Sequence, residues 1–217
     1  MVLKKFLVIK KLYEDNFQLH GDSPAALLTP KGRNSDRFGV LAPYVADGTT
    51  LLDYGSGLGL LYDYLVNDLG KKVHYTGCDI ISEFIDRSAE KFPQANFKKI
   101  DPDERINGHF DIVFASGVFN LAFDDVEEVA KEYAFSRIKD LYKACSEIFV
   151  CDFLTEYVDF KQAGALHFSV GEVSDFCFRE FGPRFLIRHN VLPYEFTLIV
   201  WKNQKIVRPQ NIYDLGK

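Results

Sequence analysis

The sequence has no surplus of basic residues. Its 217 residues include 26 Lys and Arg against 31 Asp and Glu, a net charge of −5. Proteins that bind a phosphate backbone usually present a basic surface, so this balance argues against a nucleic-acid partner. The sequence also lacks an apolar run long enough for a membrane span, and its lysine-containing start has no signal-peptide apolar centre.

Cysteine is scarce as well. The four cysteines, Cys78, Cys145, Cys151 and Cys177, have spacings that suit neither a zinc knuckle nor a CxxC pair. We expect them to be small buried residues in a reducing compartment, the cytoplasm. No metal-ligand cluster, repeat or low-complexity tract stands out. With 47% apolar residues, the chain is long enough for one α/β domain with a full core, residues 1–217.

The most informative segment is 50–59, which reads TLLDYGSGLG. A buried strand with Leu51 and Leu52 ends at Asp53 and is followed by a glycine-rich turn. A helix with apolar residues on one face comes next, at Leu61, Leu65 and Leu69. Such a strand, turn and helix form a cradle for a nucleoside-containing ligand, and the glycines let the ligand approach the backbone.

The glycine spacing narrows the type of ligand. The pattern is G-x-G-x-G, and Leu60 stands where a dinucleotide fingerprint has its third glycine. Asp53, two residues before the first glycine, would be a poor neighbour for a pyrophosphate. An acid at that position suits a cationic or amino-bearing ligand better.

Further acids end the next two strands. Asp79 ends a strand over 72–79 and lies twenty residues beyond Gly59, a separation expected for a carboxylate that binds ribose hydroxyls. The alternative for Asp79 is a solvated residue that caps the helix over 81–92. Asp101 ends a short strand over 95–101.

The remaining pattern predicts a mostly parallel sheet with an antiparallel end. A central strand lies in 110–120, a helix in 124–145, a strand in 146–152, and a helix after the capping box Ser169–Glu172. Two strands, 184–191 and 194–202, are joined at Leu192 and Pro193. A connection that short permits only an antiparallel pair.

The motif DYGSGLG resembles the first motif of class I S-adenosylmethionine (SAM) methyltransferases. The order of elements over 35–203 is similar to their Rossmann-like seven-stranded α/β sheet, with helices on both faces. The resemblance implies SAM as cofactor, with Asp53 contacting its methionine part and Asp79 its ribose. It also implies that Asp101 accepts from the adenine amino group and that a fourth motif, FDIVFASGVFN, lies beside the methyl group. The cofactor residues implied are Asp53, Gly55, Ser56, Gly57, Gly59, Asp79, Ile80, Asp101 and Ser116.

The fourth motif and the flanks indicate the acceptor. The motif lacks the Asn/Asp-Pro-Pro-aromatic element of enzymes that methylate nucleic-acid bases, which argues against those substrates. The flanks are similar to small stand-alone bacterial methyltransferases, so we expect O-methylation of a polar small molecule such as a sugar, a nucleotide-linked sugar or a surface-glycan precursor. The alternatives are an N-methyltransferase of an amino sugar or other amine, a non-catalytic SAM-binding partner, and a nicotinamide dehydrogenase, which Leu60 and the terminal hairpin disfavour.

The chain ends and two histidines complete the site predictions. Residues 1–34 are expected to form a lid over the cofactor, with loop structure around 17–24 and 29–33. Within this segment, Arg33 is expected to bind the methionine carboxylate or an anionic group of the acceptor, and it is preferred to Lys31 for this role. His167 and His20 are candidate bases for a hydroxyl proton, although His167 could equally pack on Phe168. Residues 204–217 are expected to be an irregular tail that could reach a partner in a homodimer.

Overall fold

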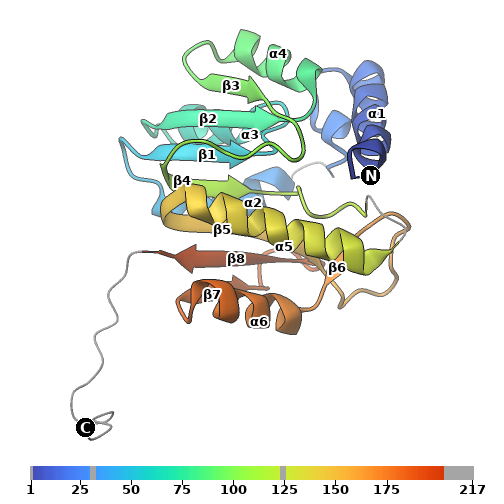
Figure 1. Cartoon of the computed structure of the whole chain (residues 1–217). Coiled ribbons are helices and arrows are strands. Elements are labelled where there is room, and N and C mark those ends of the chain that lie inside the picture. Colours follow the sequence, from blue (N-terminus) through green and yellow to red (C-terminus); the bar gives the residue numbers. More distant parts are fainter. Residues whose placement is uncertain (1, 30–32, 123–125, 203–217) are drawn as a thin grey trace, which may run out of the picture.

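The computed structural model describes residues 2–29, 33–122 and 126–202. A twisted β-sheet forms its centre, with the strand order β3-β2-β1-β4-β5-β8-β7 and a short strand β6 that pairs with β5 (Figure 1). The pairs among β1 to β5 are parallel, whereas β8 is antiparallel to both β5 and β7. The strands are β1 Thr50–Tyr54, β2 His74–Asp79, β3 Asn96–Lys99, β4 Phe110–Ala115, β5 Cys145–Thr155, β6 His167–Phe168, β7 Phe185–Arg188 and β8 Glu195–Trp201.

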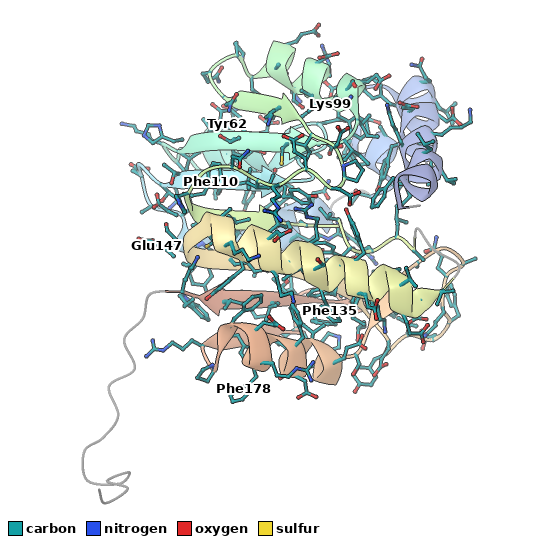
Figure 2. The ribbon with its side chains drawn as sticks, viewed as in Figure 1. Tyr62, Lys99, Phe110, Phe135, Glu147 and Phe178 are labelled. Atoms are coloured by element: carbon teal, nitrogen blue, oxygen red, sulfur yellow. The ribbon has the colours of Figure 1, made fainter. Side chains whose placement is uncertain are left out.

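Helices cover both faces of this sheet, as the sequence predicted. They are α1 Val2–His20, α2 Arg33–Leu41, α3 Leu60–Asp63, α4 Ser82–Lys91, α5 Glu127–Ala144 and α6 Val170–Phe181. Alternate residues of each strand point to opposite faces, so Leu51 packs towards α2 and α3, and Leu52 towards α5 and α6. Between α5 and α6, the rings of Phe135 and Phe176 stack at a centroid distance of 4.3 Å (Figure 2).

Two local signals in the C-terminal half are confirmed. The Ser169 hydroxyl accepts from the amide of Gly171, and the Glu172 side chain accepts from the amide of Ser169, so α6 begins with the predicted capping box. β7 and β8 form the predicted antiparallel hairpin, with Phe185 opposite Val200. His189 lies after β7 rather than within it, and its ring stacks on Tyr157.

The N-terminal segment is more helical than predicted. α1 runs to His20 and therefore includes residues 17–20, which the sequence analysis placed in a loop. Its Tyr13 and Phe17 rings pack edge-on against Phe84 of α4, at 6.0 and 5.5 Å. A 3-10 turn, η1, follows at Pro24–Leu27, and α2 begins at Arg33. The predicted boundary between residues 34 and 35 thus falls inside a helix, while Lys31 and the tail 204–217 lie outside the described residues.

The helix after the glycine turn also departs from the predicted periodicity. α3 continues as a π-helical turn, η3, at Tyr64–Asp68. Leu61 and Leu65 are buried as predicted, but Leu69 is 43% exposed. A π turn holds more residues than an α turn, so it rotates the residue that follows away from the buried face. Within the described ranges, no helix is both long and apolar enough to span a membrane.

The C-terminal end of α5 is held by a lysine that follows β8. The Lys202 ammonium donates to the carbonyls of Tyr142, Lys143 and Cys145, at 3.1, 3.3 and 2.6 Å. The carbonyls of Tyr142 and Lys143 lie in the last turn of α5, at the negative end of the helix dipole. Replacing Lys202 by Met should therefore lower the free energy of unfolding by about 1–2 kcal/mol in urea titrations.

Lys98→Met is the matched control for that variant. Lys98 makes an exposed ion pair with Glu104 on the surface and caps no helix. This control should leave the free energy of unfolding nearly unchanged. Equal effects of the two substitutions would show that Lys202 does not stabilise α5 through its carbonyls.

Candidate functional site

β1 ends in a glycine turn that leads into α3. Gly55, Gly57 and Gly59 have φ angles of 79°, 52° and 71°, a left-handed conformation that is costly for other residues. The amides of Gly55 and Ser56 donate to the carbonyl of Cys78 at 2.8 and 3.0 Å, which ties the turn to β2. The Ser56 hydroxyl is buried and has no hydrogen-bond partner in the described part of the chain.

Asp53 lies just before this turn, near the end of β1. Its carboxylate is 4% exposed and accepts a hydrogen bond of 2.5 Å from the Tyr75 hydroxyl. Burial raises the pKa of Asp53 to about 7, the hydrogen bond from Tyr75 opposes this rise, and the nearby Asp79 carboxylate adds to it. A buried acid in this state can ionise when a cation arrives.

Asp79 ends β2 on the other side of the turn. One carboxylate oxygen accepts from the Gly57 amide at 2.9 Å, and the other from the Ile81 amide at 3.0 Å. Burial raises the pKa of Asp79, and the backbone hydrogen bonds oppose that rise. Asp79 therefore fastens the glycine turn to the start of α4. Asp79 and the neighbouring Ile80 also line a cavity at this end of the sheet.

At the end of β4, Ser116 lies beside the same cavity. Its hydroxyl donates to the Asp152 carboxylate, which also accepts from the Gly117 amide at 2.7 Å. Asp152 is 2% exposed on β5, and burial raises its pKa, an effect that Arg37 opposes. This arrangement fixes the position of the β4 exit. The sequence analysis included Ser116 but did not find Asp152.

A buried ion pair joins α2 to the C-terminal hairpin. Arg37 donates from Nε and Nη2 to the two oxygens of Glu195, at 2.7 and 2.5 Å. The side chains are 12% and 5% exposed, and both line the cavity. The hydrogen bond to Glu195 and the Asp152 charge raise the pKa of Arg37 against the opposing effect of burial. The sequence analysis missed Glu195. A single acid in an otherwise apolar strand was the signal that could have indicated a functional residue there.

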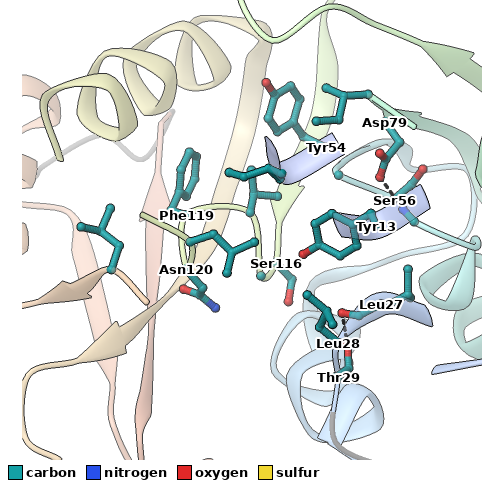
Figure 3. A pocket seen from close by; sticks show the side chains of 18 of the residues that line it. Tyr13, Leu27, Leu28, Thr29, Tyr54, Ser56, Asp79, Ser116, Phe119 and Asn120 are labelled. Atoms are coloured by element: carbon teal, nitrogen blue, oxygen red, sulfur yellow. Dashed lines mark hydrogen bonds between the residues drawn. The ribbon is translucent and has the colours of Figure 1, made fainter. Parts of the chain in front are cut away.

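These residues surround a cavity of about 510 Å³, within the usual range for small-molecule sites. We call one end of it the cofactor half, which is lined by Asp53, Gly55, Ser56, Gly57, Asp79, Ile80, Ile100 and Pro102. The other end is the outer half, lined by Phe119, Asn120, Leu121, Leu154 and Leu166. Figure 3 shows Asp79 and Ser56 on one side, Phe119 and Asn120 on the other, and Tyr13 between them.

Three predicted site residues are not among those that line this cavity. His167 is buried in β6, where burial and the charge of Lys161 lower its pKa, and it does not line the cavity. His20 is exposed at the end of α1. Asp101 is exposed beside a separate cavity of about 130 Å³, which it shares with Ile80. Gly59 starts α3 behind the turn, and Arg33 lines the main cavity from α2.

A metal centre has no support in the described ranges. No group of three or more His, Cys, Asp or Glu residues there is arranged to hold a metal ion. The four cysteines are buried and unpaired.

The chain was compared with known families and relatives. Residues 52–140 match a family model described as a methyltransferase domain. A protein of Mycobacterium tuberculosis that is named as a methyltransferase is 29% identical over 159 residues, which cover 72% of this chain and 95% of that protein. The matched range runs from β1 to α5 and so contains most of the cofactor half.

Solved structures share the fold at lower identity. A SAM-dependent methyltransferase from Aquifex aeolicus has a TM-score of 0.59 and 18% identity, over 88% of this chain and 98% of that one. A TehB-like SAM-dependent methyltransferase from Corynebacterium glutamicum has a TM-score of 0.55 and 19% identity, over 77% and 88%. These structures confirm the predicted arrangement of sheet and helices.

Proposed function

We propose that this chain, a class I SAM-dependent methyltransferase, transfers the methyl group to a hydroxyl of a small molecule. The observation that carries this proposal is the continuous cavity of about 510 Å³, which joins the glycine turn to the outer half. Among hydroxyl compounds, the sequence favours sugars, nucleotide-linked sugars and related glycan precursors, and these are the first acceptors to test.

The residues of the cofactor half fit SAM. The buried Ser56 hydroxyl lacks a partner in the described chain, and Asp53 offers a carboxylate to a cationic group. In this proposal, the glycine turn and Asp53 hold the methionine part, and Asp79 and Ile80 hold the ribose. Arg33 holds the carboxylate. When bound, SAM supplies an activated methyl group, so the protein mainly aligns the acceptor oxygen with it in a dry site.

A small amine is the second candidate acceptor. Neither His167 nor His20 lines the cavity, and the sequence offered them as the bases for a hydroxyl proton. A neutral amine needs no base before it attacks the methyl group. The position of the two histidines therefore supports N-methylation of an amino sugar or other amine as the alternative.

The N-terminal segment fits a lid over this site. Phe6, Ile9 and Tyr13 of α1 line the cavity together with Leu27 and Leu28. We propose that residues 1–34 close over the bound cofactor and acceptor, and that residues 35–203 form the SAM-binding core. A cytoplasmic location without nucleic-acid or membrane partners belongs to the same proposal, supported by composition and charge. A homodimer, to which the tail 204–217 would contribute, is also part of it.

Calorimetry with SAM, S-adenosylhomocysteine and NAD tests the cofactor. Both sulfur nucleosides should bind and NAD should not. Turnover is then scored as S-adenosylhomocysteine formed with sugars, nucleotide sugars, phenols and amines. Binding of NAD alone would contradict the proposed function.

Substitution of Arg33 by Ala tests the proposed carboxylate contact. Arg33 and Arg37 lie one turn apart on α2 and both line the cavity, but Arg37 is already paired with Glu195. We expect Arg33→Ala to weaken SAM or acceptor binding about tenfold or more, as lost charge-assisted hydrogen bonds do. Isothermal titration measures the SAM effect and the KM measures the acceptor effect. If neither constant changes, Arg33 has no role in binding.

The affinity for SAM should rise with pH up to about 7. In the free protein the pKa of Asp53 is about 7, so Asp53 is largely protonated below that pH. A cationic ligand favours the ionised form, and binding below pH 7 therefore releases a proton. The association constant should increase by up to about tenfold per pH unit between pH 5.5 and 7 and then level off.

Two variants test the source of this pH dependence by calorimetry. Tyr75→Phe removes the donor that stabilises ionised Asp53, so the midpoint should move to higher pH. Tyr62→Phe is the control, because the Tyr62 ring packs on Tyr75 at 5.2 Å. Asp53→Asn should weaken the dependence, with Asp79 as the remaining buried acid. An affinity that rises as the pH falls would refute this account.

A further inference from the structure

The outer half of the cavity is walled mainly by apolar side chains. Phe119 and Leu166 are 4% and 2% exposed, and Leu121 and Leu154 complete this wall. The Leu121–Ala165 bridge and the hydrogen bond from the Leu166 amide to the Asn120 carbonyl hold the two sides of this wall together. An acceptor that enters this half must therefore place most of its surface against carbon.

Two polar side chains of the cavity are engaged within the protein, whereas Gln162 also lines the cavity. The Asn120 side-chain oxygen accepts from the Leu154 amide at 3.2 Å, and the Thr29 hydroxyl donates to the Leu27 carbonyl at 3.1 Å. Each hydroxyl that is buried without a partner costs about 1–3 kcal/mol. A sugar carries several hydroxyls, and this wall offers them few partners.

Arg37 and Glu195 form a neutral pair at the junction of the two halves, and the buried Asp152 carboxyl lies close to both. Arg37 is neutralised by the bidentate contact with Glu195, and its Nη1 lies 3.9 Å from the ideal Cβ position of Gly117, at the β4 exit. A carboxylate or phosphate there would lie near Glu195 and Asp152. An ammonium group would lie near Arg37. A neutral hydroxyl, which both donates and accepts, suits this junction best.

We propose that the methyl acceptor is a neutral phenol or alcohol with an apolar body, whose hydroxyl lies between Tyr13, Arg37 and Ser116. Figure 3 shows Tyr13 and Ser116 at this junction, with Phe119 beyond them. The inference rests on the proposed methyl transfer and narrows its acceptor, since free sugars and charged amines become poor ligands. In the reaction, the S–CH₃ bond breaks as the O–CH₃ bond forms, and the hydroxyl proton leaves to the solvent.

Four small probes with different head groups test this acceptor class. The full chain is saturated with S-adenosylhomocysteine, and binding of phenol, benzoate, benzylamine and glucose is measured by calorimetry and ligand-observed NMR. Phenol should bind at least tenfold more tightly than each of the other three. If glucose, benzoate or benzylamine binds as tightly as phenol, the proposed acceptor class is wrong.

Substitutions in the wall locate the probe. Leu154→Gln should weaken phenol binding at least tenfold and leave the S-adenosylhomocysteine affinity unchanged. Leu186→Gln is the matched control, because Leu186 is 42% exposed on β7 and does not line the cavity. If Leu154→Gln does not fold, Leu121→Gln replaces it, since Leu121 lines the cavity and is only half-buried.

The outcomes separate this inference from the function on which it rests. If phenol binding is unchanged in the wall variants, or falls equally in Leu186→Gln, phenol does not occupy the outer half and the inference fails. If S-adenosylhomocysteine does not bind the wild-type chain, the proposed function fails as well. Binding of S-adenosylhomocysteine with a preference for glucose overturns only the acceptor class.

Discussion

Replacing Gly55 by Ala should cost the protein both stability and cofactor binding. Gly55 has φ 79°, and a Cβ built on it would lie 2.4 Å from Cγ2 of Val118. The left-handed conformation costs an L-residue about 1–2 kcal/mol, and the overlap adds about 1–3 kcal/mol more. Because Gly55 starts the turn that lines the cofactor half, the affinity for SAM should fall at least tenfold.

Gly48→Ala separates the two contributions to this effect. Gly48 has φ 84°, almost the same as Gly55, but a Cβ there would meet no atom within 4 Å. This variant should show only the backbone strain and should bind SAM normally. The double variant Gly55→Ala with Val118→Ala removes Cγ2, so it should recover stability relative to Gly55→Ala alone. Urea unfolding measures the free energies, and calorimetry measures SAM binding.

Equal losses in Gly48→Ala and Gly55→Ala would show that contact with Val118 is unimportant. A Gly55→Ala variant that binds SAM like the wild type would contradict the assignment of the turn as the cofactor site. Val118 lies in the β4 exit, so the clash links the first and the fourth motif of the sequence. Strain at one motif is therefore expected to displace the other.

Local signals in the sequence predicted most of the fold. The glycine turn, the capping box at Ser169 and the short connection at Leu192 each depend on neighbours within a few residues, and all three have the predicted form. The prediction that Leu69 lies on the buried face of its helix was wrong. A π turn precedes Leu69 and changes the helical phase, and the spacing of apolar residues does not reveal such a turn. The helix α1 was not predicted, and its last residues, 17–20, were placed in a loop because this segment is rich in glycine, proline and ionisable groups.

The candidate site was less predictable because its contacts are long-range. Arg37 and Glu195 are 158 positions apart, and Ser116 and Asp152 are 36 apart. Nothing in the local pattern of either residue specifies its partner. Asp79 shows a related difficulty, because the acid was expected at this strand end, whereas its bond to the Gly57 amide depends on how the turn folds back.

Breaking the Arg37–Glu195 pair should strongly destabilise the protein. Glu195 is buried and the Arg37 side chain is only 12% exposed, so removing one leaves the other as an uncompensated, largely buried charge. Such a loss typically costs about 3–5 kcal/mol. We expect Arg37→Met and Glu195→Gln each to lower the free energy of unfolding by an amount of this order, measured in urea.

The double variant Arg37→Met with Glu195→Gln should be more stable than either single variant, because no buried charge of the pair remains without a partner. The exposed pair Lys139–Glu180 is the control, with an N–O distance of 3.7 Å and side chains 42% and 39% exposed. Its coupling energy should be below about 1 kcal/mol. If the Arg37–Glu195 coupling is equally small, the pair does not hold α2 to the hairpin. The charge balance at the junction of the cavity would then have to come from other residues.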